Sequence, residues 1–181
     1  MPEALVIVDF QNDFTPGGAL AVPHGDEIVG RIGELLDSGR FELVVATRDW
    51  HPADHGSFTT VRPPGIWPPH CIQNTPGAEL HESLDRRRVD VVVDKGVESW
   101  SEGYSGFQNT ALEQRLREHA IDGLTVVGLA TDYCVRHTAL DALAAGFEVT
   151  VDRGAVRGID ATPGDAQRAL AEIAEAGGSL I

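Results

Sequence analysis

The chain has 181 residues, of which 28 are Asp or Glu and 14 are Lys or Arg, giving a formal net charge of −14 with histidine neutral. This negative charge disfavours binding to the phosphate backbone of nucleic acids. The hydrophobic content of 42% is ordinary for a globular protein, and the length favours a single domain over residues 1–181.

The start of the chain and its cysteines indicate the compartment. The first basic residue is Arg31, so the N-terminal segment lacks the positive region of a signal peptide, and no apolar run approaches the ~20 residues of a membrane span. Cys71 and Cys134 form no CxxC pair, which is typical of a reducing compartment. We therefore expect a cytoplasmic protein without a membrane partner, and the sequence leaves a homo-oligomer open.

Apolar segments rich in Val, Ile and Leu alternate with segments of helical periodicity. In chain order the sequence predicts a strand at 4–9, a helix at 26–36, strands at 42–47 and 89–94, a helix at 110–119, a strand at 124–129, a helix at 131–145, a strand at 147–152, a helix at 165–176 and a weak strand at 178–181. The strands are continuously apolar, as in parallel sheets covered on both faces. This order predicts a doubly wound α/β fold, with a mostly parallel sheet of about six strands and helices on both faces.

One segment, from His51 to about Leu80, interrupts this alternation. It contains too many prolines for a helix or an interior strand, namely Pro52, Pro63, Pro64, Pro68, Pro69 and Pro76. Loops of this length within compact domains usually have a function.

Chemically reactive side chains follow three of the predicted strands. Asp9 ends the first strand, Lys95, the only lysine, follows the third, and Cys134 follows the fourth, where Thr131 or Asp132 is a plausible N-cap of the next helix. Open α/β sheets bind ligands at the carboxyl ends of their strands. A helix start and a nearby lysine would favour the thiolate, and Asp9 would accept its proton. The three residues suit hydrolysis of an acyl–nitrogen bond, whereas Cys134 alone would be interpreted as a small buried hydrophobe.

A second group of polar residues lies around the proline-rich loop. Asp49 and His51 are two positions apart, so in an extended segment their side chains point the same way, and His55 and His70 follow in the loop. One carboxylate with three imidazoles suits a first-row divalent ion such as Zn, Fe or Mn. The alternative is that these histidines are surface residues bonded to the backbone, and it competes most strongly for His55.

Several aromatic residues stand beside these polar positions and could stack against a flat ligand. They are Phe14, Trp50, Trp67, Trp100 and Tyr104. For Trp50 and Trp100, packing within the core or the loops is the simpler interpretation.

At these positions the sequence resembles the nicotinamidase branch of the isochorismatase-like cysteine hydrolases. The matching stretches are VDFQNDFTPGGALAVP at 8–23, ATRDWHPADHGSF at 46–58, WPPHC at 67–71, DKG at 94–96, YSGF at 104–107 and GLATDYCVRHTALDA at 128–142. The resemblance implies hydrolysis of nicotinamide to nicotinate and ammonia through a cysteine thioester, as a step of NAD salvage, commonly with activity on pyrazinamide.

The resemblance also implies roles for individual residues. Asp9 would be the general base, Lys95 the cation that stabilises the thiolate, and Cys134 the nucleophile. The backbone N–H groups of Ala130 and Cys134 would form the oxyanion hole, with a cis peptide bond before Ala130. The metal, one divalent transition-metal ion per subunit, would orient the pyridine ring and be held by Asp49, His51, His55 and His70. The walls that stack against the ring would be Phe14, Trp67 and Tyr104.

Three other functions compete with this one. A sister amidohydrolase acting on a ureido or carbamoyl substrate would use the same thiolate, but such relatives lack the grouped acid and histidines of the loop. A metal-dependent hydrolase in which bound water attacks would leave the single lysine unexplained. A non-catalytic binding module on the same fold would not need Asp9, Lys95 and Cys134 together.

Overall fold

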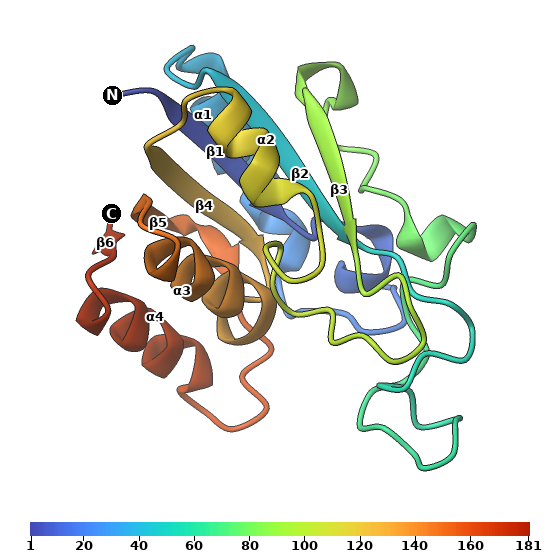
Figure 1. The fold of residues 1–181 in the computed structure, drawn as a ribbon. Helices are drawn as coiled ribbons and strands as arrows, with labels where there is room; N and C mark the ends of the chain where they lie inside the picture. The colour runs from blue at the N-terminus through green and yellow to red at the C-terminus, as the bar shows by residue number, and fades with distance from the viewer.

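The computed structural model describes residues 1–181, and its elements follow the predicted alternation (Figure 1). The strands are β1 Glu3–Val8, β2 Leu43–Asp49, β3 Val91–Lys95, β4 Gly123–Leu129, β5 Glu148–Arg157 and β6 Ser179–Leu180. The helices are α1 Val29–Asp37, α2 Leu112–Glu118, α3 Arg136–Ala144 and α4 Asp165–Glu175. A π-helical turn, Thr131–Val135, leads into α3, and short 3-10 turns lie at Asn12–Phe14, Gly25–Ile28, Pro76–Ala78 and Arg86–Arg88.

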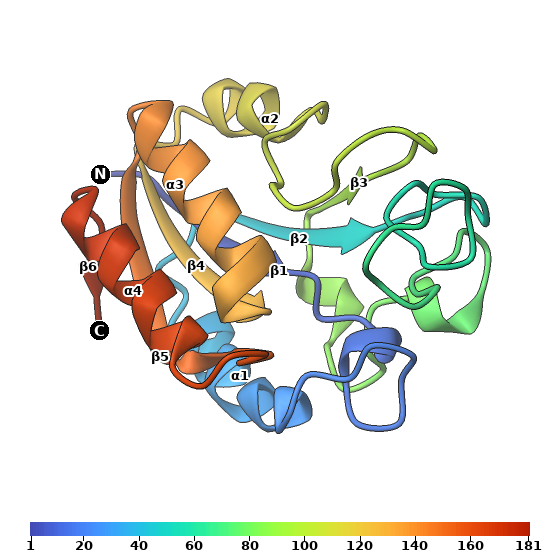
Figure 2. The ribbon, with the colours of Figure 1, turned by 90° about the horizontal axis from the view of Figure 1, so that it is seen from below.

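The six strands form one parallel sheet in the order β3-β2-β1-β4-β5-β6. In the view from below, α2 and α3 cover one face of the sheet and α1 the other (Figure 2). This arrangement confirms the predicted doubly wound α/β fold. The fifth strand extends to Arg157, five residues further than its apolar run predicted.

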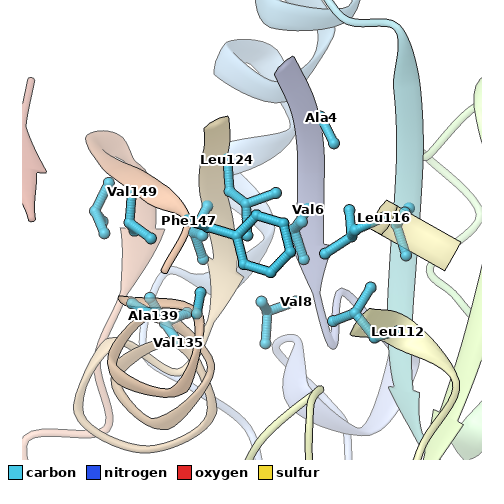
Figure 3. Close-up of a cluster of buried hydrophobic side chains, with 14 of the residues drawn as sticks. Ala4, Val6, Val8, Leu112, Leu116, Leu124, Val135, Ala139, Phe147 and Val149 are labelled. Atoms are coloured by element: carbon cyan, nitrogen blue, oxygen red, sulfur yellow. The ribbon is translucent and has the colours of Figure 1, made fainter. Parts of the chain in front are cut away.

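Alternate residues of the central strand explain why both faces of the sheet are apolar. Val6 and Val8 of β1 point into a cluster with α2 and α3 (Figure 3), whereas Leu5 and Ile7 point into a second cluster with α1. All four side chains are fully buried. A strand buried on both faces has no polar alternation, which is why its sequence is continuously apolar.

The order of the strands reverses at β1, which pairs with β2 on one side and β4 on the other. Gly128 in β4 permits this close pairing, because a Cβ at this position, where φ is +115°, would collide with the backbone of Val8. Doubly wound sheets have their ligand crevice at such a reversal, beyond the carboxyl ends of the strands. The long loops after β2 and β3 extend from this same end of the molecule (Figure 1).

The helices of this fold are short. None of them is long and apolar enough to cross a lipid bilayer.

Candidate active site

Asp9, Lys95 and Cys134 meet at the carboxyl end of the sheet, although they come from three different strands or strand ends. Lys95 Nζ lies 2.7 Å from Asp9 Oδ2 and 3.4 Å from Cys134 Sγ, and it also donates to the Gly103 carbonyl. Thr47 donates a hydrogen bond of 2.7 Å to Asp9 Oδ1. Asp9 Oδ2 accepts no well-aligned hydrogen bond, so the oxygen nearest the lysine retains a free lone pair. The ammonium thus stands between a buried carboxylate and a buried thiol.

Cys134 lies in the π-helical turn between β4 and α3. The N-cap of this turn is Ala130 in an extended conformation and makes no side-chain cap, so the prediction that Thr131 or Asp132 caps the helix was wrong. The carboxylate of Asp132 instead accepts the backbone N–H groups of Ile159 and Asp160, because the chain after β5 folds back over this turn. The peptide bond between Leu129 and Ala130 is cis.

The charges of this cluster depend on one another. Burial raises the pKa of Asp9 to about 6, although Lys95 acts in the opposite direction. Burial also raises the pKa of Cys134 well above its usual value, and Asp9 adds to this, while Lys95 lowers it. The pKa of Lys95 is raised well above its usual value because the nearby carboxylates, Asp49 first, outweigh the effect of burial. Cys134 therefore holds its proton at rest, next to a carboxylate able to accept it.

Asp49, His51 and His70 form a second buried group beside the first. Their ligand atoms all lie within 4.8 Å of one another. Asp49 Oδ2 is 3.3 Å from His51 Nε2 and 3.8 Å from His70 Nε2, while Lys95 binds the other oxygen of the same carboxylate. Burial alone would raise the pKa of Asp49, but Lys95 and His51 hold it well below its usual range. Asp49 thus joins the two groups.

The donor set of this second group fits a metal ion. Nδ1 of His51 lies 2.8 Å from the Gly96 carbonyl and Nδ1 of His70 lies 2.7 Å from the Pro68 carbonyl. A carbonyl only accepts, so each Nδ1 carries a hydrogen, and in the neutral imidazole each Nε2 then presents a lone pair toward the Asp49 carboxylate. In that form three acceptors face one another, and a cation between them, a proton or a metal ion, satisfies all three. A carboxylate with two imidazole nitrogens is a typical ligand set for Zn or another first-row divalent ion.

His55 lies beside this group but its nitrogens have other partners. Its ring stacks on that of His51 with centroids 4.0 Å apart, its Nε2 lies 2.8 Å from the Ser101 carbonyl, and its Nδ1 lies 2.7 Å from Ser57 Oγ. Burial, together with the charge of His51, lowers the pKa of His55 to about 4. The structure therefore brings together three of the four expected ligands.

A cavity of about 400 Å³ is lined by Cys134 of the first group and by all three residues of the second, while Asp9 and Lys95 are buried and do not line it. Ala130, Phe14, Trp67 and Tyr104 also line it. Trp67 Nε1 donates a hydrogen bond of 2.9 Å to the hydroxyl of Tyr104, which fixes these two rings relative to each other. The volume lies within the ~300–1,000 Å³ range of small-molecule sites.

Several residues of the site are not apparent from the sequence. Tyr133 lines the cavity and meets Trp67 edge to face, with centroids 5.0 Å apart. Trp100, for which packing was the simpler interpretation, is 79% exposed at the cavity. Thr47 donates a hydrogen bond to Asp9, but it lies within an apolar strand and nothing in its neighbouring sequence indicates a role in the site. Its position opposite the end of β1 would identify it as a partner of Asp9 once the strand pairing is known.

The chain matches the model of the isochorismatase domain over residues 3–181. The chain belongs to the isochorismatase family. Within this family, the nicotinamidase of Escherichia coli (strain K12) is 45% identical over an alignment 200 residues long, which covers 99% of this chain and 94% of that protein.

Two solved structures of family members are also similar along the whole chain. The pyrazinamidase of Pyrococcus horikoshii in complex with zinc is 46% identical, with a TM-score of 0.87, and the alignment covers 100% of this chain and 99% of that one. PnC1 from L. infantum in complex with nicotinate is 35% identical, with a TM-score of 0.94, and covers 99% of this chain and 92% of that one.

Proposed function

We propose that this protein is a nicotinamidase that also hydrolyses pyrazinamide, releasing ammonia and the aromatic carboxylate. One observation carries the proposal: Cys134, whose sulfur contacts the buried Asp9–Lys95 pair through the Lys95 ammonium, lines one cavity with Asp49, His51 and His70. The names of the similar proteins above agree with this activity. Nicotinate formed in this way would enter NAD salvage.

In the proposed first half of the reaction, Cys134 Sγ attacks the amide carbon while Asp9 takes the thiol proton. The C–S bond forms, and the carbonyl oxygen becomes an oxyanion that the backbone N–H groups of Ala130 and Cys134 stabilise. Asp9 then gives its proton to the nitrogen, the C–N bond breaks, and ammonia leaves a thioester on Cys134. Lys95 stays protonated and offsets the negative charge that moves between sulfur and carboxylate.

In the second half, Asp9 takes a proton from water, whose oxygen attacks the thioester carbon. The C–S bond breaks, Asp9 returns this proton to the sulfur, and the product leaves as a carboxylate after its acid proton passes to solvent. The same carboxylate thus acts as base and acid in both halves, which suits its pKa of about 6.

The other group of residues would recognise the ring. Asp49, His51 and His70 would hold one divalent transition-metal ion, which supplies a Lewis-acidic site for the ring nitrogen and so orients the substrate. Phe14, Trp67 and Tyr104 would form the walls against which the flat ring stacks.

The test is ammonia release from nicotinamide by the purified protein, before and after chelation, with a carbamoyl amide in parallel. We expect turnover of nicotinamide that chelation abolishes and added metal restores. Turnover of the carbamoyl amide alone would retain the cysteine chemistry but assign the protein to the sister amidohydrolases.

The roles of the three histidines can be separated by elemental analysis. His51→Ala and His70→Ala should each lose most of the bound metal, because each removes an Nε2 that faces Asp49. His55→Ala should retain it, because His55 Nε2 is bonded to the Ser101 carbonyl. Loss of metal from the His55 variant as well would restore the four-ligand site that the sequence predicts.

The pH dependence of the reaction should report on Asp9. The carboxylate must be ionised to take the thiol proton, so kcat/KM should fall as the pH drops below about 6. Thr47→Val should move this acid limb to higher pH. The hydrogen bond from Thr47 stabilises the ionised carboxylate of Asp9, so its removal raises the pKa of Asp9. An acid limb that stays in place in this variant would show that another group controls it.

A further inference from the structure

The sequence Gln11-Asn12-Asp13 begins two residues after Asp9, and none of its side chains has a role in the proposed reaction. Gln11 is fully buried, and its amide lies against the main chain of Asp49. Its Oε1 accepts the N–H of Asp49 at 2.8 Å, and its Nε2 donates to the carbonyl of Asp49, also at 2.8 Å. The same Nε2 donates to the carbonyl of Ala78 at 2.8 Å.

These contacts compensate for the early end of β1. The last bond from this strand end to β2 runs from Asp9 N–H to the Thr47 carbonyl, because Asp9 adopts a φ of +48° and the chain turns away from the sheet. The N–H and carbonyl of Asp49 would then lack a partner on this side. The amide of Gln11 offers one acceptor and two donors, so it replaces the missing strand. It fixes the backbone from which the Asp49 carboxylate projects.

Asp13 makes a corresponding contact on the other side of the site. Its Oδ2 accepts the N–H of Cys71 at 2.7 Å, and its Oδ1 accepts the N–H of Ala19 at 3.2 Å. Cys71 follows His70 and has a φ of +46°. The carbonyl of Cys71 accepts a hydrogen bond of 2.9 Å from the N–H of His51. A non-glycine residue in this left-handed conformation needs support from its surroundings. The carboxylate of Asp13 supplies it at the point where the backbones of both histidines meet.

Gly77 shapes the space that Asp13 occupies. A Cβ at this position would collide with the Asp13 carboxylate. The acid is therefore packed against the loop that it holds, and a side chain at Gly77 would displace it.

We propose that Gln11 and Asp13 are positioning residues of the metal site: Gln11 fixes Asp49, and Asp13 fixes the Cys71 backbone that joins His70 to His51. The inference rests on the proposed metal-dependent function, and it concerns residues that would not touch the ion or the substrate. Groups that orient metal ligands from behind commonly account for about 10- to 100-fold in metal affinity.

The test is zinc affinity, measured by competition between the apoprotein and a chromophoric chelator. Gln11→Met keeps the approximate shape and removes all three hydrogen bonds, and Asp13→Asn keeps one acceptor oxygen. We expect both variants to bind zinc about 10- to 100-fold more weakly than the wild type, with the larger loss for Gln11→Met. The visible spectrum of bound Co(II) should change in the same variants, because it reports the geometry of the ligands.

Asn12→Ala is the matched control. Asn12 Nδ2 donates to the Pro76 carbonyl at 2.7 Å, so this variant also loses a hydrogen bond from the same segment, but no residue of the metal site takes part in it. Its zinc affinity should equal that of the wild type. If Gln11→Met does not fold, Asp13→Asn and Gly77→Ala test the other side of the site independently.

The outcomes distinguish this inference from the proposed function. Variants that lower the melting temperature of the apoprotein but bind zinc as tightly as the wild type would show that Gln11 and Asp13 only stabilise the fold. When the wild type hydrolyses nicotinamide and binds zinc, unchanged zinc affinity in the variants overturns the positioning role and leaves the proposed function intact. If the wild type takes up no zinc, the metal site and the positioning role both fail.

Discussion

Replacing Cys134 with alanine is expected to lower ammonia release from nicotinamide by at least about 10⁴-fold, because it removes the proposed nucleophile. The loss should appear in kcat at every pH, since no other thiol lines the cavity. Cys71, the other cysteine, is fully buried outside it. Acid-quenched wild-type enzyme should carry an acyl adduct by intact-mass spectrometry, and the variant should not.

The control for this variant is its metal content. Cys134 lies beside Asp49 but is not a member of the Asp49, His51 and His70 group, so Cys134→Ala should bind zinc as the wild type does and keep its circular dichroism spectrum. Substantial turnover that persists in the folded, metal-loaded variant would contradict the cysteine mechanism. It would favour attack by a metal-bound water, in which the thiol only packs.

Lys95→Met is expected to destabilise the protein by about 3–5 kcal/mol at neutral pH, the usual cost of removing one partner from a buried ion pair. Lys95 is completely buried at its ammonium and contacts the carboxylates of Asp9 and Asp49. Without it, two buried negative charges face each other with no cation between them. Urea unfolding at neutral pH measures the loss, and ammonia release should fall with it.

The pH dependence of this loss has a defined sign. The pKa of Lys95 is raised, so the lysine keeps its charge and its stabilising effect until the pH rises through that value. In the variant the carboxylates lack their cation, so their pKa values rise and their protonation favours the folded state as the pH falls. The difference in unfolding free energy between wild type and variant should therefore be larger at pH 8 than at pH 5. An equal difference at both pH values would show that lost packing, and not charge, is the cause.

Alkylation of Cys134 gives a second measurement on the same variant. The charge of Lys95 lowers the pKa of Cys134, so its removal should shift the alkylation profile to higher pH. An unchanged profile would contradict the role of the lysine, independently of stability.

The sequence was most informative where a property is local. Continuous apolar runs identified the central strands β1 and β4 because burial on both faces acts on nearly every residue there, whereas the partly exposed two-residue strand β6 left only a weak signal. The spacing of Asp49 and His51 placed their side chains together because a strand has a two-residue period, and His51 Nε2 does lie 3.3 Å from Asp49 Oδ2. Local signals failed at the turn that carries Cys134, where Asp132 binds Ile159 and Asp160 instead of capping the helix.

The sequence alone indicated the fold class, the carboxyl-end location of the site and the grouping of the only lysine with Asp9 and Cys134, since these follow from the hydrophobic period and from the convergence of the carboxyl ends of parallel strands at one edge. Only the tertiary structure decided that His55 bonds to Ser101 and that Gln11 pairs with the backbone of Asp49. Both contacts join segments far apart in the chain, 46 and 38 residues in these two cases, and no local pattern encodes them. Packing decides which histidine nitrogen or side-chain amide at the site already has a hydrogen-bond partner and which is available to a ligand, because a buried polar atom pairs with whichever group the fold brings to it.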